Sequence, residues 1–457
     1  MSDRRSIMFL TFCLSVLFQV SCREKDDPAI EGEMVTIMMH MNSSRDEVRT
    51  MDVEKGTVPG HEPNWTVNYP KHVMTGWYRD PECTVPFDFF TDVIDGPLDV
   101  YMGWGPELLL TDKGKVARVT GKSQTGESAL ANPNRTDERW NLGGTDLGII
   151  WEMANGEYGV FFGDSYGSDF RPCGGGPGGA SDWRSNVLAF SQSTDFSRGL
   201  VFSDMYHEPL SPNRAAAVII RENYLSFTYI PTAAISLDGN EYMHYMYWEV
   251  GDRSHDNKVY SSFVKSENNG RSWSMCNGKI SFSHDSYFGM VAMATKPGDE
   301  YCYMMGARTG AGYRKSSARL ARFRHSDILD KSQYEFWNSK DGMWIKGDES
   351  KAGDVLDGTV GEMSLMYFEQ YDRWVAMYFD SAAYAICYRS AARVNGPWSE
   401  EHVLCRGTDW RYAQLYGSFI HPACAKKEWG SAPVYWTISQ WQPYNVFLMK
   451  AEASLAK

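Results

Sequence analysis

The sequence predicts an all-β protein whose main part is a five-bladed β-propeller. Aromatic residues make up 14% of the 457 residues, and 41 glycines can supply tight turns between short strands. Helical periodicity is nearly absent, and only residues 316–329 hint at a helix. Five strand–turn–strand units begin near residues 146, 233, 289, 362 and 417. Their continuous apolar strands fit blades that bury both faces against neighbours, whereas a β-sandwich is the alternative fold.

The first 22 residues resemble a bacterial lipoprotein signal. Arg4 and Arg5 precede an apolar stretch that ends at Ser21 and Cys22, although Gln19 stands where Leu is usual. The resemblance implies that residues 1–21 are removed and that Cys22 carries lipid. Residues 22–33 resemble the acidic tether of Bacteroidota lipoproteins. We therefore expect an outer-membrane lipoprotein exposed at the cell surface, with plain secretion as the alternative.

Residues 34–105 are predicted to form a small β domain before the propeller. An apolar run at 34–41 has strand length, prolines mark the turns, and residues 98–104 alternate at strand period. The series "GWYRDPECTVPFDF…LDVYMGW" resembles the Listeria–Bacteroides repeat, a β-grasp-like module of surface proteins. The resemblance implies a spacer or adhesion element, and glycan binding is the alternative role.

Residues 106–457 are expected to form the propeller. The turns at Asn155-Gly156 and at Asp238-Gly239-Asn240 favour hairpins, because their central residues tolerate positive φ. Residues 116–119 could supply a strand that closes the ring. Residues 266–273 resemble an Asp-box turn, with Asn268 in place of the Asp, and this motif caps a hairpin without being catalytic.

Charge and cysteine usage exclude several functions. Lys and Arg number 45 against 58 Asp and Glu, and a net charge of −13 makes a nucleic-acid partner unfavourable. The nine cysteines form no CxxC pair, and no HExxH or GxSxG motif occurs, so we expect no metal, no cofactor and no serine esterase. Cys387 and Cys405 could bridge neighbouring strands, but spacing alone leaves this open. We expect a monomer.

Two carboxylates flank the first predicted hairpin of the propeller. If Asn155-Gly156 is its tip, Asp146 begins one strand, Asp164 follows the other, and residue 147 pairs with 164. Neighbouring carboxylates repel, so one pKa rises and the pair can act as acid and base. Glycosidic cleavage uses this arrangement, whereas the alternative is that each Asp caps a turn.

The segment "RWNLGGTDLGIIWEMANGEYGVFFGDSYG" at 139–167 resembles the signature of the domain-of-unknown-function 4185 family, classed as glycoside hydrolase family 183. Further matches are "WRSN" at 183–186, "GEMS" at 361–364 and "SQWQPYNV" at 439–446. The resemblance implies a five-bladed propeller with endo-D-arabinanase activity on the arabinan of mycobacterial-type arabinogalactan or lipoarabinomannan. By motif, its two catalytic aspartates fall on Asp146 and Asp164. We expect Asp146 to be the nucleophile or base and Asp164 the general acid, and a buried Asp146 with a raised pKa would reverse these roles.

Several further side chains are expected to hold a polysaccharide at the channel mouth. Aromatic faces suit the apolar faces of sugars, and amides and charged groups suit their hydroxyls. The expected substrate-binding residues are Trp183, Arg184, Asn186, Glu362, His421, Gln440, Trp441 and Asn445. Glu362 could also be a third acid or could cap its strand. A non-catalytic glycan-binding propeller is the main alternative function, and a sialidase is weaker because no arginine cluster is visible.

Overall fold

The computed structural model describes residues 32–43, 47–63, 69–172, 181–219, 227–249 and 260–457. The expected signal, Cys22 and nearly all of the tether lie outside the described residues. Within the described ranges, no helix is long and apolar enough to cross a membrane.

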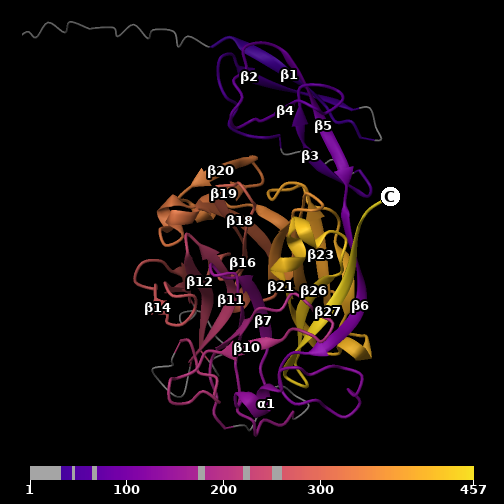
Figure 1. The fold of residues 1–457 in the computed structure, drawn as a ribbon. Helices are drawn as coiled ribbons and strands as arrows, with labels where there is room; N and C mark the ends of the chain where they lie inside the picture. The colour runs from indigo at the N-terminus through magenta and orange to yellow at the C-terminus, as the bar shows by residue number, and fades with distance from the viewer. Residues whose placement is uncertain (1–31, 44–46, 64–68, 173–180, 220–226, 250–259) are drawn as a thin grey trace, which may run out of the picture.

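The N-terminal residues form a separate five-stranded sheet, drawn in indigo in Figure 1. Its strands are β1 (Met34–His40), β2 (Val48–Glu54), β3 (His72–Tyr78), β4 (Pro86–Phe87) and β5 (Leu98–Pro106), in the order β2-β1-β5-β3-β4. β1 and β5 pair in parallel, and the other neighbours pair antiparallel. Ile37, Met39 and Val100 are fully buried in a cluster of this sheet alone. The likeness to the Listeria–Bacteroides repeat and to a β-grasp stays a prediction.

The remaining strands form five blades around a channel, as predicted, instead of a sandwich of two sheets. The inner strands β7, β11, β16, β21 and β25 contact one another in a closed ring. Blade one holds β7 (Leu147–Glu152), β8 (Tyr158–Phe162), β9 (Val187–Ser191) and β10 (Phe202–Met205). Blade two holds β11 (Phe227–Leu237), β12 (Asn240–Glu249), β13 (Tyr260–Ser266) and β14 (Ser274–Met275), with β15 (Phe282–Ser283) also on β13.

Blades three and four share one sheet, because β18 pairs with the first part of the long strand β21. Blade three holds β16 (Met290–Thr295), β17 (Tyr301–Ala307), β18 (Ser316–Arg324), β19 (Glu335–Asn338) and β20 (Met343–Lys346). Blade four holds β21 (Asp354–Phe368), β22 (Arg373–Asp380), β23 (Ala385–Ala391) and β24 (His402–Arg406). The stretch 316–329 therefore begins with a strand and is not a helix.

Blade five is closed by a strand from the start of the propeller. It holds β25 (Leu415–Ile420), β26 (Val434–Gln440) and β27 (Asn445–Leu455), and β6 (Leu108–Arg118) pairs antiparallel with β27. The predicted closing segment at 116–119 lies at the end of β6. Closure joins the two ends of the propeller chain through a ladder of backbone hydrogen bonds, as Figure 1 shows beside the C-terminus.

Helices are short within the described residues. The α-helix is α1 (Thr136–Arg139). The 3₁₀ turns are η1 (Gly310–Gly312), η2 (His325–Asp327), η3 (Lys331–Gln333), η4 (Glu349–Lys351), η5 (Trp410–Tyr412), η6 (Pro422–Ala425) and η7 (Lys427–Trp429).

The Asp-box-like turn caps a hairpin, as its sequence predicts. Between β13 and β14, the Gly270 amide donates to Ser266 Oγ over 2.9 Å, and the Ser272 amide donates to Asn268 Oδ1 over 2.8 Å. Asn268 therefore takes the structural role of the Asp in the motif. The six cysteines within the described residues are free thiols. Cys387 and Cys405 lie on the paired strands β23 and β24 but in different core clusters, so they are not bridged.

The propeller has two distinct ends. The short helix α1, which precedes β7 in the chain, lies at one end, and the N-terminal sheet lies at the opposite end (Figure 1). At that opposite end, Arg373 Nε donates to the carbonyl of Pro106 over 2.9 Å, and the Glu62 amide donates to the carbonyl of Gly342 over 2.8 Å. These bonds join the N-terminal sheet to blades four and three.

Candidate active site

The first hairpin of the propeller brings Asp146 and Asp164 to the α1 end of the channel, in a register that differs from the predicted one. Leu147 pairs with Phe162, not with residue 164. The hairpin itself pairs one residue away from the predicted register, with Glu152 opposite Tyr158, and a bulge at Gly148, whose φ is 94°, shifts the pairing by one residue more. Asp146 consequently lies opposite Gly163, whose amide donates to the Asp146 carbonyl over 3.2 Å.

The glycine at 163 makes room for the Asp146 carboxylate. A Cβ at this position would lie 2.4 Å from Asp146 Oδ1, closer than any real contact. Asp146 Oδ2 accepts hydrogen bonds from Tyr416 Oη over 2.8 Å and from Tyr444 Oη over 3.1 Å. Oδ1 is buried and has no hydrogen-bond partner among the described residues. One carboxylate oxygen is thus held by two donors, and the other is unpartnered.

The surroundings of Asp146 raise its pKa from 3.8 to about 7. Burial is the largest cause, and the negative charges of Asp164 and Glu362 add to it. The hydrogen bonds from Tyr416 and Tyr444 oppose the shift by stabilising the ionised form. At neutral pH this carboxyl is therefore divided between its acid and its ionised forms.

Asp164 follows β8 and is oriented from blades one and two. Thr228 Oγ1, on β11, donates to Asp164 Oδ1 over 2.7 Å. The next residue, Ser165, exchanges backbone hydrogen bonds of 2.7 and 2.8 Å with Arg184. The Arg184 guanidinium donates to the carbonyls of Ala215 and Asn141, which anchors this segment. Asp164 is thus held on a rigid support beside Asp146.

Glu362 lies on the inner part of β21 and is locked by two neighbours. It is 5% exposed and accepts hydrogen bonds from Tyr313 Oη over 2.6 Å and from Arg314 Nη2 over 2.5 Å. The Arg314 guanidinium also lies 5.1 Å from the centre of the Tyr416 ring. The ion pair with Arg314 and the hydrogen bond from Tyr313 fix this carboxylate in place, and its charge adds to the raised pKa of Asp146.

Two of the predicted tryptophans lie near these carboxylates. Trp441 is 41% exposed, and its ring meets the rings of Tyr416 and Tyr444 edge-on at 6.2 and 5.6 Å. Trp183 is partly buried and donates a hydrogen bond to Tyr166. Burial and the charges of both aspartates raise the pKa of Tyr166. An exposed indole beside a carboxylate pair can stack on a sugar ring.

Five other predicted binding residues are buried in structural contacts, which corrects the expectation that they line the channel mouth. Asn186 accepts the amides of Val218 and Ile219, and Arg184 binds the carbonyls named above. Their side chains serve the backbone because a loop at a blade end must satisfy its own polar groups. The five residues are Arg184, Asn186, His421, Gln440 and Asn445.

His421, Gln440 and Asn445 belong to blade five. His421 follows the far end of β25 and caps η6 through Nδ1, so it lies at the wrong end of the strand for the channel site. Gln440 Nε2 donates to the Ala413 carbonyl over 2.8 Å. Asn445 Oδ1 accepts from Thr120 Oγ1 over 3.0 Å and joins the closing strand segment to β27. A position near the start of a blade therefore did not predict whether a side chain faces the channel or forms a structural contact.

The sequence reasoning missed the side chains that surround the carboxylates. Tyr444 belongs to the matched segment at 439–446, and Tyr416 lies just before the unit that begins near residue 417, but neither was expected to donate a hydrogen bond to Asp146. Tyr313 and Arg314 lie in the connection between β17 and β18 of blade three and carry no motif. A search for tyrosines just before or at inner strands would have found Tyr416, whereas Arg314 gave no sequence signal. Among the described residues, no cluster of His, Cys, Asp and Glu could hold a metal ion.

A family model described as a domain of unknown function, DUF4185, matches residues 131–450. The chain belongs to the DUF4185 family. The match begins after the closing strand β6 and covers α1, all five inner strands and both aspartates of the first hairpin. The N-terminal sheet lies outside it.

Known relatives of this DUF4185 protein are distant. The Notoamide biosynthesis cluster protein J′ of Aspergillus versicolor is 24% identical over 305 residues, which cover 64% of this chain and 80% of the relative. A crystal structure of a suggested hydrolase from Bacteroides ovatus aligns with a TM-score of 0.50 at 12% identity, covering 69% of this chain and 87% of the other. A GH43_1 enzyme from Xanthomonas citri aligns with a TM-score of 0.40 at 11% identity, covering 68% and 88%. The Bacteroides structure shows a shared fold.

Proposed function

We propose that this protein is an endo-acting glycoside hydrolase that uses Asp146 and Asp164 as its acid and base pair. The observation that supports the proposal is that two neighbouring carboxyls have different environments. Asp146 has a pKa of about 7 and an unpartnered Oδ1, whereas Asp164 accepts a hydrogen bond from Thr228. A raised pKa keeps a proton available near neutral pH, which is what a general acid requires.

The raised pKa of Asp146 reverses the roles expected from sequence. Asp146 delivers its proton to the leaving glycosidic oxygen as the bond from that oxygen to the anomeric carbon breaks. The ionised Asp146 is then stabilised by the hydroxyls of Tyr416 and Tyr444, which already donate to Oδ2. Asp164 either attacks the anomeric carbon or takes a proton from the water that attacks it.

The proposed substrate is D-arabinan, as in mycobacterial-type arabinogalactan or lipoarabinomannan, cleaved at arabinofuranosidic bonds. The family resemblance of residues 139–167 and 439–446 supports this choice. Trp441 supports a polymer substrate, because its exposed face adjoins the tyrosines that hold Asp146.

The decisive test is product release from a panel of purified glycans. Arabinogalactan, lipoarabinomannan, plant arabinan and xylan are incubated with the purified chain, and released oligosaccharides are separated by chromatography. We expect oligosaccharides from the D-arabinans and none from Asp164→Asn. Binding of D-arabinan without any release would support the glycan-binding alternative, and release from xylan alone would refute the substrate class.

We also propose that a lipid on Cys22 anchors the monomeric protein to the outer membrane at the cell surface. The support is the arrangement of Arg4, Arg5, the apolar stretch and Ser21 before this cysteine. Cys22→Ala should release the protein from the membrane fraction, and globomycin should block its processing. A Cys22→Ala protein that stays in the membrane would exclude the anchor.

A further inference from the structure

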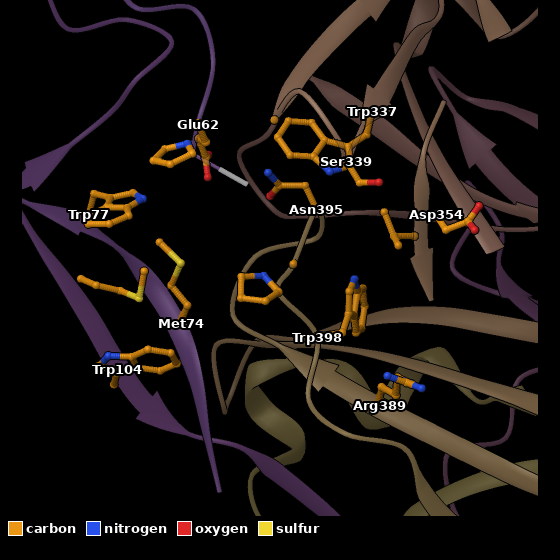
Figure 2. Close-up of a pocket in the computed structure, with 16 residues that line it drawn as sticks. Glu62, Met74, Trp77, Trp104, Trp337, Ser339, Asp354, Arg389, Asn395 and Trp398 are labelled. Atoms are coloured by element: carbon orange, nitrogen blue, oxygen red, sulfur yellow. The ribbon is translucent and has the colours of Figure 1, made fainter. Parts of the chain in front are cut away.

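A trough runs along the seam between the N-terminal sheet and the propeller, at the end opposite the aspartates. Its central hollow has a volume of about 290 Å³ and is lined by Trp77 and Trp104 from the N-terminal sheet and by Trp337 and Trp398 from the propeller (Figure 2). A second hollow of about 610 Å³ shares Met74, Trp104 and Trp398 with it, and a third of about 400 Å³ shares Trp77 and Asn395. The three hollows share lining residues and lie next to one another along the seam, so the trough suits an extended ligand.

The charged side chains that line the central hollow have partners of opposite charge within the protein. Glu62 forms an ion pair with Arg393, and this pair joins the N-terminal sheet to the propeller. Asp354 pairs with Arg319 over 3.0 Å, and Arg389 pairs with Asp357. A charged ligand would find no free counter-charge among these lining residues. The central hollow therefore disfavours phosphates and acidic or basic peptides.

Neutral hydrogen-bonding groups in the trough are left without partners. Trp398 Nε1 is buried and has no hydrogen-bond partner in the described structure. Asn395 lies between the side chains of Trp77 and Trp337, and no described residue accepts from its amide nitrogen (Figure 2). A buried donor without a partner costs free energy, which a ligand acceptor can recover.

We propose that this seam trough binds a neutral glycan chain, as a second carbohydrate site separate from the catalytic channel. The partly exposed indole rings of Trp104 and Trp398 offer flat apolar faces to the CH faces of sugars, and the Trp398 and Asn395 donors bind sugar hydroxyls. The site requires both halves of the seam, because the N-terminal sheet supplies Trp104 and the propeller supplies Trp398. The N-terminal sheet thus acts as part of a glycan-binding site instead of only a spacer.

The seam lies far from the aspartates. Glu362, beside Asp146, and Phe368, at the far end of β21, are separated by six strand residues, which is roughly 20 Å at about 3.3 Å per residue. A glycan held in the seam therefore occupies neither Asp146 nor Asp164. Such a site raises the time that the protein stays on an insoluble or branched polymer while the channel acts on another segment.

The test measures binding of defined probes by the full chain without its signal. Arabinogalactan, linear arabinan, xylan and a β-glucan are used in affinity electrophoresis and titration calorimetry. Trp398→Phe removes the unpartnered N–H but keeps an aromatic ring, and Asn395→Ala removes the amide. We expect each variant to weaken binding of at least one probe fivefold or more, and the double variant to abolish the seam contribution. Trp410→Phe is the matched control, because Trp410 is 86% exposed outside the trough.

The outcomes separate this inference from the proposed hydrolase activity, on which it does not rest. Unchanged probe binding by the double variant, with its melting temperature either kept or lowered, would overturn the seam site and show a packing interface only. Product release is assayed separately with Asp164→Asn. If the wild type releases nothing but the seam variants still lose binding, the seam site stands and the proposed activity fails.

Discussion

At the α1 end of the propeller, three carboxylates converge, and one of them, Asp146, lacks a neutralising cation. At the seam end, Glu62 and Asp354 each have an arginine partner. Both ends are rich in aromatic residues. At the channel, Tyr416 and Tyr444 point hydroxyls at a carboxylate, but at the seam, indole rings line an open trough. A buried carboxyl without a neutralising cation thus distinguishes the end suited to catalysis from the end suited to binding a ligand.

The largest expected effect is loss of activity when either aspartate at the α1 end is replaced. Asp164→Asn and Asp146→Asn should each lower kcat/KM on D-arabinan by about 10³-fold or more, because acid–base transfer is lost while the fold is kept. Asp372→Asn is the matched control, since Asp372 is exposed on a turn with a φ of 51° that Asn tolerates. Release rates from the purified variants provide the measurement. Near-wild-type rates in either catalytic variant would remove that residue from the mechanism.

Gly163→Ala tests whether the channel depends on room for the Asp146 carboxylate. The added Cβ would meet Asp146 Oδ1 at 2.4 Å, so the carboxylate must shift, and we expect roughly a 10²-fold loss in kcat. Gly278→Ala adds the same group in open space at an ordinary φ and should leave the rate unchanged. An unchanged rate in Gly163→Ala would mean that the position of Asp146 is not critical.

Trp441→Ala tests which end binds the segment that is cleaved. Removing its exposed ring should raise KM for D-arabinan about tenfold with a smaller change in kcat, because stacking on a sugar ring is lost. Seam binding of the probe glycans should persist in this variant. If Trp441→Ala abolishes all glycan binding, the two ends are not independent sites.

The pH profile tests the electrostatic origin of the difference. Asp146 must be protonated to act as the acid, so kcat/KM should fall as the pH rises above about 7. Tyr416→Phe removes a hydrogen bond that lowers the pKa of Asp146, and the alkaline limb should move upward by about half a unit to one unit. Tyr412→Phe, which removes a hydroxyl bonded to Asp112 instead, should leave the limb in place.

The same raised pKa predicts that the folding stability of the protein also depends on pH. Because the folded state raises the pKa of Asp146 above its ordinary value of 3.8, the wild type loses folding stability as the pH rises from about 4 to about 7. Asp146→Asn does not titrate, so its gain in melting temperature over the wild type should be larger at pH 8 than at pH 5. Calorimetric scans at the two pH values measure this gain, and an equal gain at both would contradict a raised pKa.

The order of strands and the blade units followed from the sequence alone. Turn residues such as Asn155-Gly156 and continuous apolar strands are local features, and each local preference agrees with the propeller. The Asp-box-like turn was predictable for the same reason, since all its hydrogen bonds lie between residues 266 and 273. Asp146 and Asp164 could be paired in advance because one hairpin carries both.

The contacts of each side chain could not be predicted from the sequence, because they depend on the tertiary structure. The bulge at Gly148 changed the register by one residue, and a one-residue change alters which side chains face each other. Arg314, Tyr313 and Tyr416 come from different blades than Asp146, so no local pattern could place them around it. The raised pKa of Asp146 and the trough at the seam both arise from long-range packing, because burial and charge depend on residues far apart in the chain.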